Sequence, residues 1–223
     1  MKSWIEDDNI NYEYIIRYLR DTIPKSEGHI FEMEKYAKEN EVPISQPESI
    51  RMIEVLLKLM NAKKILEIGS AIGYSAIRMS RASGAEVVTV ELLDEMADIA
   101  EDNFKKAGLD KKIRLIRGDG KEVLSKMEGE GVFDVIFVDA AKGQYMDIFP
   151  DCERLLRNGG LLISDNILYK GMTATDELVV RRKITIVRRL RAYLDMLKNN
   201  KAFSTAIVPI GDGVALSFKE NEA

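Results

Sequence analysis

The sequence has little of the chemistry that builds disulfide frameworks and thiolate metal sites. Its 223 residues include one cysteine, Cys152, and one histidine. A single cysteine excludes an intramolecular disulfide framework and any metal site made of several thiolates. Cys152 lies in the helix-like stretch DCERLLR, where we expect a buried structural thiol.

Long apolar runs are also missing. No stretch of about 18 or more apolar residues occurs, so we expect no membrane span. The first residues, MKSWIEDDNINYEY, lack the basic and apolar regions of a secretory signal peptide. The net charge is −4, which gives no general case for nucleic-acid binding but leaves room for a local basic patch. We therefore expect a cytoplasmic protein.

The composition that remains is typical of a single soluble domain with a full core. Hydrophobic residues make up 46% of the chain and charged residues 31%. Helical spacing of apolar residues predicts helices over 11–23, 27–40 and 47–60, and Pro47 suits a helix start. We therefore expect residues 1–60 to form a helical cap on a core that spans 61–223.

Beyond residue 60 the pattern alternates between strands and helices. Short apolar runs rich in β-branched residues predict strands at 63–69, 85–91, 112–119, 131–140 and 159–166. Helical patterns separate them, at 73–82, 93–107, 119–127 and 143–157. This alternation predicts an α/β fold in which a mostly parallel sheet carries helices on both faces.

The C-terminal part departs from this alternation. A long helix is expected over about 176–199, and two strand-like runs follow at 203–210 and 213–219. The segment GDG joins them, which predicts an antiparallel hairpin and about seven strands in all. In open α/β sheets ligands bind outside the carboxyl ends of the strands, so the residues that follow each strand are the candidate site.

The turn after the first predicted strand, EIGSAIGYS, is one candidate. Gly69 and Gly73 would let the backbone approach a ligand, and the helix that follows would offer free N–H groups to an anion. The spacing differs from the Gly-x-Gly-x-x-Gly of dinucleotide-binding proteins, and a tight structural turn is an equal alternative. Ser75 could bond a cofactor carboxylate or be an ordinary serine of the first helical turn.

Acidic residues end the next two strands. Glu91 follows Gly69 by 22 residues, where an acid can accept hydrogen bonds from the ribose hydroxyls of a nucleoside cofactor. A solvated strand-end acid is the alternative. Asp119 ends the third strand, where it could reach an adenine edge or cap the next helix.

A third group of polar residues follows the fourth and fifth strands. Asp139 ends one of them, and Asp165 and Asn166 end the other. If these strands are close in the sheet, their oxygens form a set that suits a hard divalent cation such as Mg²⁺. Each residue alone also fits a cap or a turn. Lys142 alone reads as a surface lysine, but beside a cation its pKa would fall, which suits it to accept a proton.

Taken together, these segments resemble a known family. ILEIGSAIGYSAIRM, VEL, DAAK and SDNILYKG are similar to motifs of the cation-dependent, S-adenosylmethionine-dependent O-methyltransferases, which include catechol and caffeoyl-CoA O-methyltransferases. The resemblance runs from about residue 42 to the C-terminal VPIGDGVALS. It implies a Rossmann-like class I methyltransferase sheet, S-adenosylmethionine and Mg²⁺ or another divalent cation as cofactors, and a homodimer.

The resemblance also implies roles for individual positions. The implied cofactor-binding residues are Ser45, Glu67, Gly69, Ser75, Glu91, Asp119, Gly120 and Asp139. Glu67, Gly69 and Ser75 would lie around the methionine end of the cofactor. Glu91 would hold the ribose, and Asp119 and Gly120 would lie beside the adenine.

The catalytic positions follow from the same resemblance. Asp139, Asp165 and Asn166 match the metal ligands, and Lys142 matches the lysine proposed as general base. In this scheme the metal lowers the pKa of an acceptor hydroxyl, Lys142 takes the proton, and the oxygen attacks the sulfonium methyl in line. Asp139 and Lys142 are therefore the predicted catalytic residues.

A basic segment points to the acceptor. RRKITIVRRLR, residues 181–191, has six basic residues in eleven. On a helix, four arginines would share one arc opposite an apolar arc of Ile184, Val187, Leu190 and Leu194. The arginines are Arg181, Arg182, Arg188 and Arg189. They could contact phosphates, or form a solvated face paired with the nearby acids Asp176 and Glu177.

A subgroup resemblance favours RNA. VPI, AIGYS, DNILYKG and the basic helix resemble bacterial tRNA 5-hydroxyuridine methyltransferases, which implies that a wobble uridine of the tRNA anticodon is the acceptor and 5-methoxyuridine the product. A small catechol or hydroxycinnamoyl-type phenol is the alternative acceptor. A non-catalytic cofactor-binding protein is a second alternative, against which the intact Asp139, Lys142 and Asp165 argue.

Overall fold

The computed structural model describes residues 10–221, and residues 1–9 and 222–223 lie outside the described part. The helices are α1 (Glu13–Asp21), α2 (Gly28–Glu39), α3 (Pro47–Leu59), α4 (Tyr74–Ser83), α5 (Asp94–Lys106), α6 (Gly120–Lys126), α7 (Tyr145–Leu155) and α8 (Ile184–Asn199). The strands are β1 (Lys64–Ile68), β2 (Glu86–Glu91), β3 (Ile113–Arg117), β4 (Phe133–Val138), β5 (Leu156–Ser164), β6 (Phe203–Val208) and β7 (Val214–Lys219). Within residues 10–221, no helix is long and apolar enough to cross a membrane.

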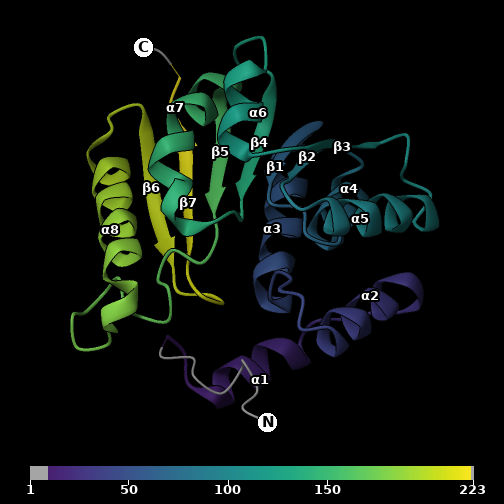
Figure 1. Ribbon diagram of the computed structural model, residues 1–223, viewed down its shortest axis with the longest axis horizontal. Coiled ribbons are helices and arrows are strands. Elements are labelled where there is room, and N and C mark those ends of the chain that lie inside the picture. Colours follow the sequence, from purple (N-terminus) through teal and green to yellow (C-terminus); the bar gives the residue numbers. More distant parts are fainter. Residues whose placement is uncertain (1–9, 222–223) are drawn as a thin grey trace.

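The strands form one seven-stranded sheet in the order β3-β2-β1-β4-β5-β7-β6 (Figure 1). Strands β1 to β5 pair in parallel, and β7 is antiparallel to both β5 and β6. The predicted α/β sheet and its C-terminal hairpin are therefore confirmed. The strand order reverses between β1 and β4, and in such sheets a ligand crevice opens at the carboxyl ends of the two strands where the order reverses.

Helices cover both faces of the sheet, and each face has its own apolar core. On one side α3, α4 and α5 pack against strand residues that include Ile65 and Phe137. On the other side α6, α7 and α8 pack against residues that include Leu66 and Val138. Neighbouring residues of one strand thus enter opposite cores, which is why the central strands read as continuous apolar runs.

The last long helix is shorter than predicted. It begins at Ile184 rather than near residue 176, and Arg181–Lys183 form a separate 3-10 turn. The segment before the turn is not helical: Val180 has an extended backbone, with a ψ of 139°, and Arg191 of α8 holds Asp176 in an ion pair at 2.6 Å. The predicted arc of four arginines is therefore divided between the turn and the helix.

The helix predicted over 143–157 also ends early. It gives way to β5 at Leu156, which pairs with Phe133 of β4. An ion pair between Arg157 and Asp134, at 2.6 Å, joins the two strands at the same level. Strand pairing and this ion pair therefore outweigh the local helical pattern.

Helix α1 lies across the carboxyl edge of the sheet, below the strand ends in Figure 1. It is held largely by polar contacts. Arg20 donates to both carboxylate oxygens of the buried Glu48 on α3, at 2.8 and 2.9 Å. Asn11, just before α1, donates to the carbonyl of Pro209 at 2.6 Å. Because Ile16 is the one buried residue of α1, this helix contributes little to the core and instead roofs the sheet edge.

Gly69, at the end of β1, offers a test of how closely β1 and β4 approach. A Cβ atom built there would lie 2.1 Å from the backbone oxygen of Asp139, and its φ of +101° disfavours other residues. We expect Gly69→Ala to lower the free energy of unfolding by about 2–4 kcal/mol. Gly84→Ala is the matched control, because that φ of +75° is also left-handed but nothing lies within 4 Å. Urea denaturation should show the control losing about 1 kcal/mol, and equal losses would contradict the close approach.

Candidate active site

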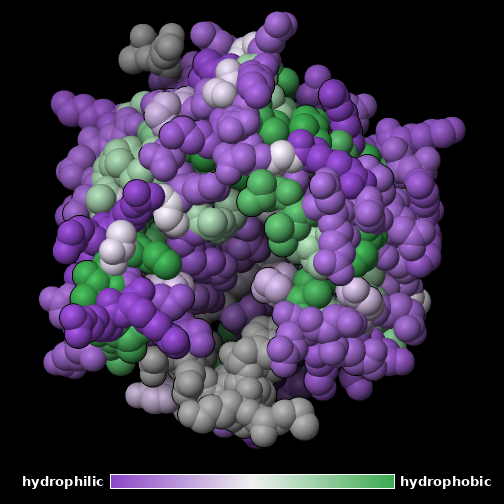
Figure 2. Space-filling model, in the orientation of Figure 1, coloured by the Kyte–Doolittle hydropathy of each residue, from purple (hydrophilic) through white to green (hydrophobic). Residues whose placement is uncertain are grey.

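A cavity of about 750 Å³ opens at the carboxyl edge of the sheet. It is formed by the segments that follow β1, β2, β4 and β5, by the β6–β7 loop, and by α1 with the loop before α3. Figure 2 shows this face of the molecule hollowed near its centre, with hydrophilic side chains predominating around the hollow. The cavity therefore lies at the reversal point of the strand order.

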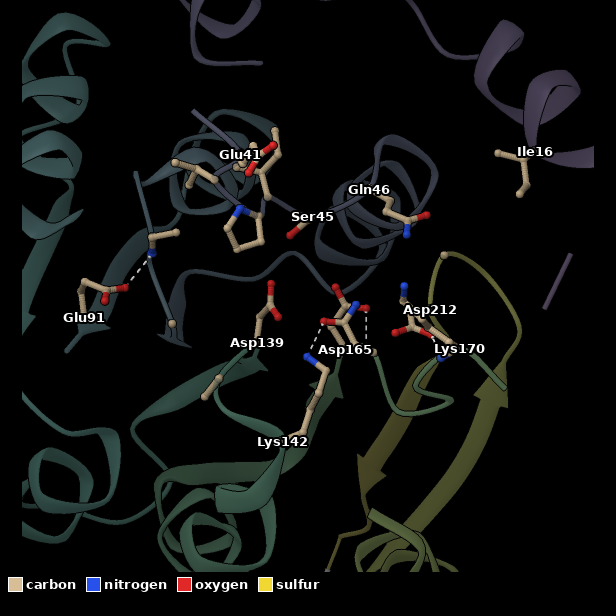
Figure 3. A pocket seen from close by; sticks show the side chains of 18 of the residues that line it. Ile16, Glu41, Ser45, Gln46, Glu91, Asp139, Lys142, Asp165, Lys170 and Asp212 are labelled. Carbon is tan, nitrogen blue, oxygen red and sulfur yellow. Dashed lines mark hydrogen bonds between the residues drawn. The ribbon is translucent and has the colours of Figure 1, made fainter. Parts of the chain in front are cut away.

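Strand pairing brings the two predicted metal-binding aspartates together. The β4–β5 register sets Val138 beside Ser164, so the next residues, Asp139 and Asp165, leave the sheet side by side. The N–H of Asp165 donates to the carbonyl of Val138 at 2.9 Å, and the hydroxyl of Tyr145 donates to the carbonyl of Asp165 at 2.8 Å. The predicted convergence of these carboxylates at the cavity is thereby confirmed (Figure 3).

The electrostatics of the pair are those of two acids kept out of water. Burial raises the pKa of both carboxyl groups, and the charge of Asp139 raises the pKa of Asp165 further. The backbone N–H of Asn166 and the ammonium of Lys142 oppose that rise for Asp165. A second positive charge between the carboxylates would relieve their repulsion, so the pair is suited to hold a cation.

Lys142 and Asn166 complete the polar cluster. Lys142 begins the 3-10 turn η1 (Lys142–Gln144), and its Nζ donates to Oδ1 of Asn166 at 3.0 Å. The backbone N–H of Asn166 donates to the carboxylate of Asp165 at 2.7 Å. Within residues 10–221 no three acidic, histidine or cysteine side chains gather around one point. A cation here would therefore depend on two carboxylates and the amide oxygen of Asn166, a donor set that fits Mg²⁺ or Mn²⁺.

The turn after β1 is built for close approach. Gly69 and Gly73 have φ values of 101° and 81°, a left-handed backbone that fits both a ligand turn and a tight structural turn. Glu91 at the end of β2 is buried, lines the cavity, and accepts the N–H groups of Ala71 at 2.8 Å and Leu93 at 2.9 Å. Glu91 is thus not a solvated strand-end acid, because its carboxylate joins the turns after β1 and β2 at the wall of the cavity.

Ser45 gives independent support for a polar ligand. Its hydroxyl is buried, lines the cavity, and has no hydrogen-bond partner among the described residues. Figure 3 shows the side chain directed into the cavity from the loop before α3. Buried hydroxyls are almost always bonded in proteins, so a bound ligand is the natural partner.

Four other predicted cofactor residues do not line the cavity. Glu67 is fully buried and accepts hydrogen bonds from Ser75 and Thr89 beneath the turn. Asp119 caps α6 by accepting the N–H of Lys121 at 2.9 Å, which agrees with the capping alternative. Gly120 packs so closely on Ile68 that a Cβ would lie 2.8 Å from that side chain. The structure thus gives these residues supporting contacts around the site.

The sequence pattern missed several residues that line the cavity. These are Arg20, Gln46, Lys170, Gly211 and Asp212. Lys170 lies in the loop after β5, but Arg20 and Gln46 follow no strand, and the segment that holds Gly211 and Asp212 read only as a hairpin turn. The folding of α1, of the loop before α3 and of the β6–β7 hairpin onto the sheet edge brings all of them except Lys170 to the site.

The predicted basic stripe adjoins the site at one point. Arg189 on α8 donates to the carbonyl of Gly143, in the turn that carries Lys142, at 2.8 Å. The other members are Arg181, Arg182 and Arg188. Their side chains are exposed and make no ion pair or hydrogen bond with the described residues.

The acid expected to neutralise this stripe pairs elsewhere, and one apolar assignment was wrong. Asp176 pairs with Arg191 at 2.6 Å rather than with a stripe arginine. Val187 and Leu190 are buried as predicted, but Ile184 is 41% exposed, because α8 begins at this residue and the turn before it does not cover the side chain.

Comparison with known proteins places this geometry among relatives. Residues 28–220 match the family model described as O-methyltransferase. A catechol O-methyltransferase of Niastella koreensis is 30% identical over 220 residues, covering 94% of this chain and 98% of the relative. Caffeoyl-CoA O-methyltransferase 2 of Populus trichocarpa is 30% identical over 231 residues, covering 96% of this chain and 90% of the relative.

Solved structures agree with these sequence relatives. A candidate caffeoyl-CoA O-methyltransferase from Staphylococcus aureus superposes with a TM-score of 0.86 at 32% identity, over 93% of this chain and 100% of that one. An O-methyltransferase from Bacillus cereus in complex with SAH (S-adenosylhomocysteine) gives a TM-score of 0.81 at 25% identity, over 93% of this chain and 97% of that one.

The buried Glu67 generates a pH prediction. Burial raises its pKa from 4.5 to about 7. The folded chain therefore keeps a proton that the unfolded chain releases near pH 4.5, and the free energy of unfolding falls as the pH rises from 4.5 to about 7. Glu67→Gln cannot ionise, so relative to wild type it should gain up to about 3 kcal/mol between pH 4.5 and 8. Urea denaturation at both pH values measures this gain, and parallel pH profiles would contradict it.

Proposed function

The chain belongs to the O-methyltransferase family, and from this premise we propose that it methylates the 5-hydroxyl of wobble 5-hydroxyuridine in tRNA with the help of a divalent cation. Methyl transfer from S-adenosylmethionine to oxygen is the activity of the family. The proposal concerns the acceptor and the cation. It also includes the homodimer and the cytoplasmic location predicted from the sequence.

The case for a cation rests on the paired aspartates. Asp139, Asp165 and Asn166 would hold it, since they present three oxygens at the wall of one cavity. A divalent cation bound there would lower the pKa of an acceptor hydroxyl by favouring its ionised form.

The chain's own residues supply positioning and proton transfer. S-adenosylmethionine supplies an electrophilic methyl group on its sulfonium. The glycine turn at Gly69, the carboxylate of Glu91 and the hydroxyl of Ser45 form the wall against which the cofactor would bind. Lys142, whose Nζ lies 3.0 Å from Oδ1 of Asn166, is placed to accept the proton that the acceptor hydroxyl loses. Holding donor and acceptor in line would supply much of the acceleration.

The observation that carries the tRNA acceptor is the basic row that ends at the catalytic turn. Arg189 donates to the carbonyl of Gly143, one residue from Lys142, so this end of the row lies beside the cavity. The first turn of α8 contains no acidic residue, and Arg181–Lys183 precede it. Basic side chains and a helix N-terminus both attract phosphate, so this segment favours an RNA backbone lying across the cavity mouth.

A small phenol is the second candidate acceptor. It is favoured by the sequence relatives, one of which is named for catechol and another for caffeoyl-CoA. A non-catalytic cofactor-binding protein is a third possibility, and the complete set of Asp139, Lys142, Asp165 and Asn166 argues against it.

Mass spectrometry of tRNA nucleosides tests the leading proposal. Cells that lack the protein should lose 5-methoxyuridine and accumulate 5-hydroxyuridine. The purified chain, with S-adenosylmethionine and Mg²⁺, should convert that tRNA to the methylated form, whereas Asp139→Asn should not. If 5-methoxyuridine were unchanged in the deleted cells and the purified chain methylated a catechol, the tRNA acceptor would be wrong. A small phenol would then be the favoured acceptor.

The basic row gives a separate prediction. Replacing Arg181, Arg182 and Arg188 with serine removes three phosphate contacts and should lower tRNA methylation about 10- to 100-fold at physiological salt. In a plot of the logarithm of the tRNA binding constant against the logarithm of the salt concentration, the slope should become shallower by about two to three. Turnover of a catechol should not change, because Arg189 is retained to hold the turn of Lys142.

A matched control for this variant replaces three exposed lysines at the opposite edge of the sheet. These are Lys111 and Lys201, which precede β3 and β6, and Lys198 in the last turn of α8. The control loses the same charge and should methylate tRNA at the wild-type rate. If the arginine variant and the lysine control behave alike, the basic row does not bind RNA.

A further inference from the structure

The loop after β5 has an unusual backbone. Three of its residues that are not glycine lie in the left-handed region: Asn166, Tyr169 and Lys170, with φ of 54°, 48° and 58°. Such conformations are uncommon, and each costs about 1 kcal/mol or more. A loop with three of them in five residues persists only if its surroundings fix it. Because Asn166 is one of the three proposed cation ligands, the contacts that fix the loop also fix the position of a ligand.

The tip of the β6–β7 hairpin supplies much of this support. The N–H of Ile167 donates to the carbonyl of Gly213 at 2.9 Å, and the N–H of Leu168 donates to the carbonyl of Asp212 at 3.0 Å. The N–H of Lys170 donates to the carboxylate of Asp212. Backbone groups of any residue could make the first two bonds, but the third requires the side chain at position 212.

The hairpin tip is itself held from both sides. A Cβ at Gly211 would lie 2.3 Å from the hydroxyl of Ser49 on α3, and a Cβ at Gly213 would lie 2.3 Å from the side chain of Leu168. The tip is therefore wedged between α3 and the loop that it bonds. It can act as a fixed support, with Asp212 at its centre and at the cavity wall (Figure 3).

The charge of Asp212 is unfavourable for Asp165. Its carboxylate raises the pKa of Asp165, to which it adds a third negative charge at the same edge. An asparagine would accept the same hydrogen bond without this repulsion. The hydrogen bond and the charge can therefore be separated experimentally.

We propose that Asp212 is a positioning residue, which accepts the N–H of Lys170 and so fixes the 166–170 loop with the carboxamide of Asn166 facing Asp139 and Asp165. The inference rests on the cation site of the proposed function. In metal sites, residues that orient a ligand typically change affinity 10- to 100-fold when they are removed.

Mn²⁺ binding to the purified full-length chain, followed by electron paramagnetic resonance, tests the inference without any turnover. Asp212→Ala should weaken Mn²⁺ binding about 10-fold or more, as expected when the support of a ligand is lost. Asp212→Asn keeps the acceptor and should bind within about threefold of wild type. Asp195→Asn, an exposed acid on α8, is the charge-matched control and should bind as wild type does. The affinity for S-adenosylhomocysteine should be the same in all four proteins.

Each outcome decides a different point. If wild type binds Mn²⁺ and Asp212→Ala binds it equally well, the positioning role is wrong and the cation site stands. If Asp212→Asn binds as weakly as Asp212→Ala, the charge rather than the hydrogen bond matters, which also overturns the inference. If wild type does not bind Mn²⁺, the cation site fails and the inference fails with it. Should Asp212→Ala not fold, Asp212→Leu replaces it, because leucine is close to aspartate in shape and offers no hydrogen-bond acceptor.

Discussion

The pairing of β4 with β5 is the constraint on which the site depends. Their register places Asp139 and Asp165 side by side where the strands end, in a region where burial raises the pKa of both carboxyl groups. Two such acids in one low-dielectric place repel, and the fold tolerates them only because the parallel sheet around them is well packed. The ammonium of Lys142 and the amide of Asn166 reach the same place from the segments after β4 and β5.

Several residues around this pair have energetically unfavourable conformations or environments, and these residues place polar groups at the site. Glu67 is buried below the glycine turn, Asn166 has a left-handed backbone, and the hydroxyl of Ser45 has no partner among the described residues. In each case the unfavourable feature lies at or beneath the cavity, while the two cores on either side of the sheet are formed by apolar side chains. Strain and unsatisfied polarity of this kind concentrate at functional sites, because a ligand or neighbouring element compensates for them there.

The elements farthest from the sheet centre shape the cavity mouth. Helix α1 roofs the sheet edge through Arg20 and Glu48, the β6–β7 hairpin supports the loop of Asn166, and α8 reaches the turn of Lys142 through Arg189. These contacts come from elements that lie outside the parallel strands and the glycine turn. In the proposed function, the paired aspartates and the glycine turn serve the transfer itself, and we expect these additions to the fold to decide the acceptor.

Much of the fold and part of the site could be predicted from local patterns. Strands that are buried on both faces form continuous apolar runs, so their positions, the glycine turn and the strand-end acids Glu91, Asp139 and Asp165 were recognisable without a structure. The start of α8 was wrong because contacts such as the ion pair of Asp176 with Arg191 hold the preceding loop, and a local helical pattern does not record them. Asp212 went unrecognised for a similar reason, since its role depends on a hairpin folding against a distant loop.

The sequence by itself thus determined the spacing of apolar and polar residues. That spacing identified the strands, their order along the chain and the residues that end them. The tertiary structure alone decided which ends meet, which acids line the cavity and which only support it. The physical reason is that periodicity and turn chemistry act over a few residues. Burial, strand register and side-chain contacts between distant segments act across the whole chain, and they set the charges and hydrogen bonds of the site.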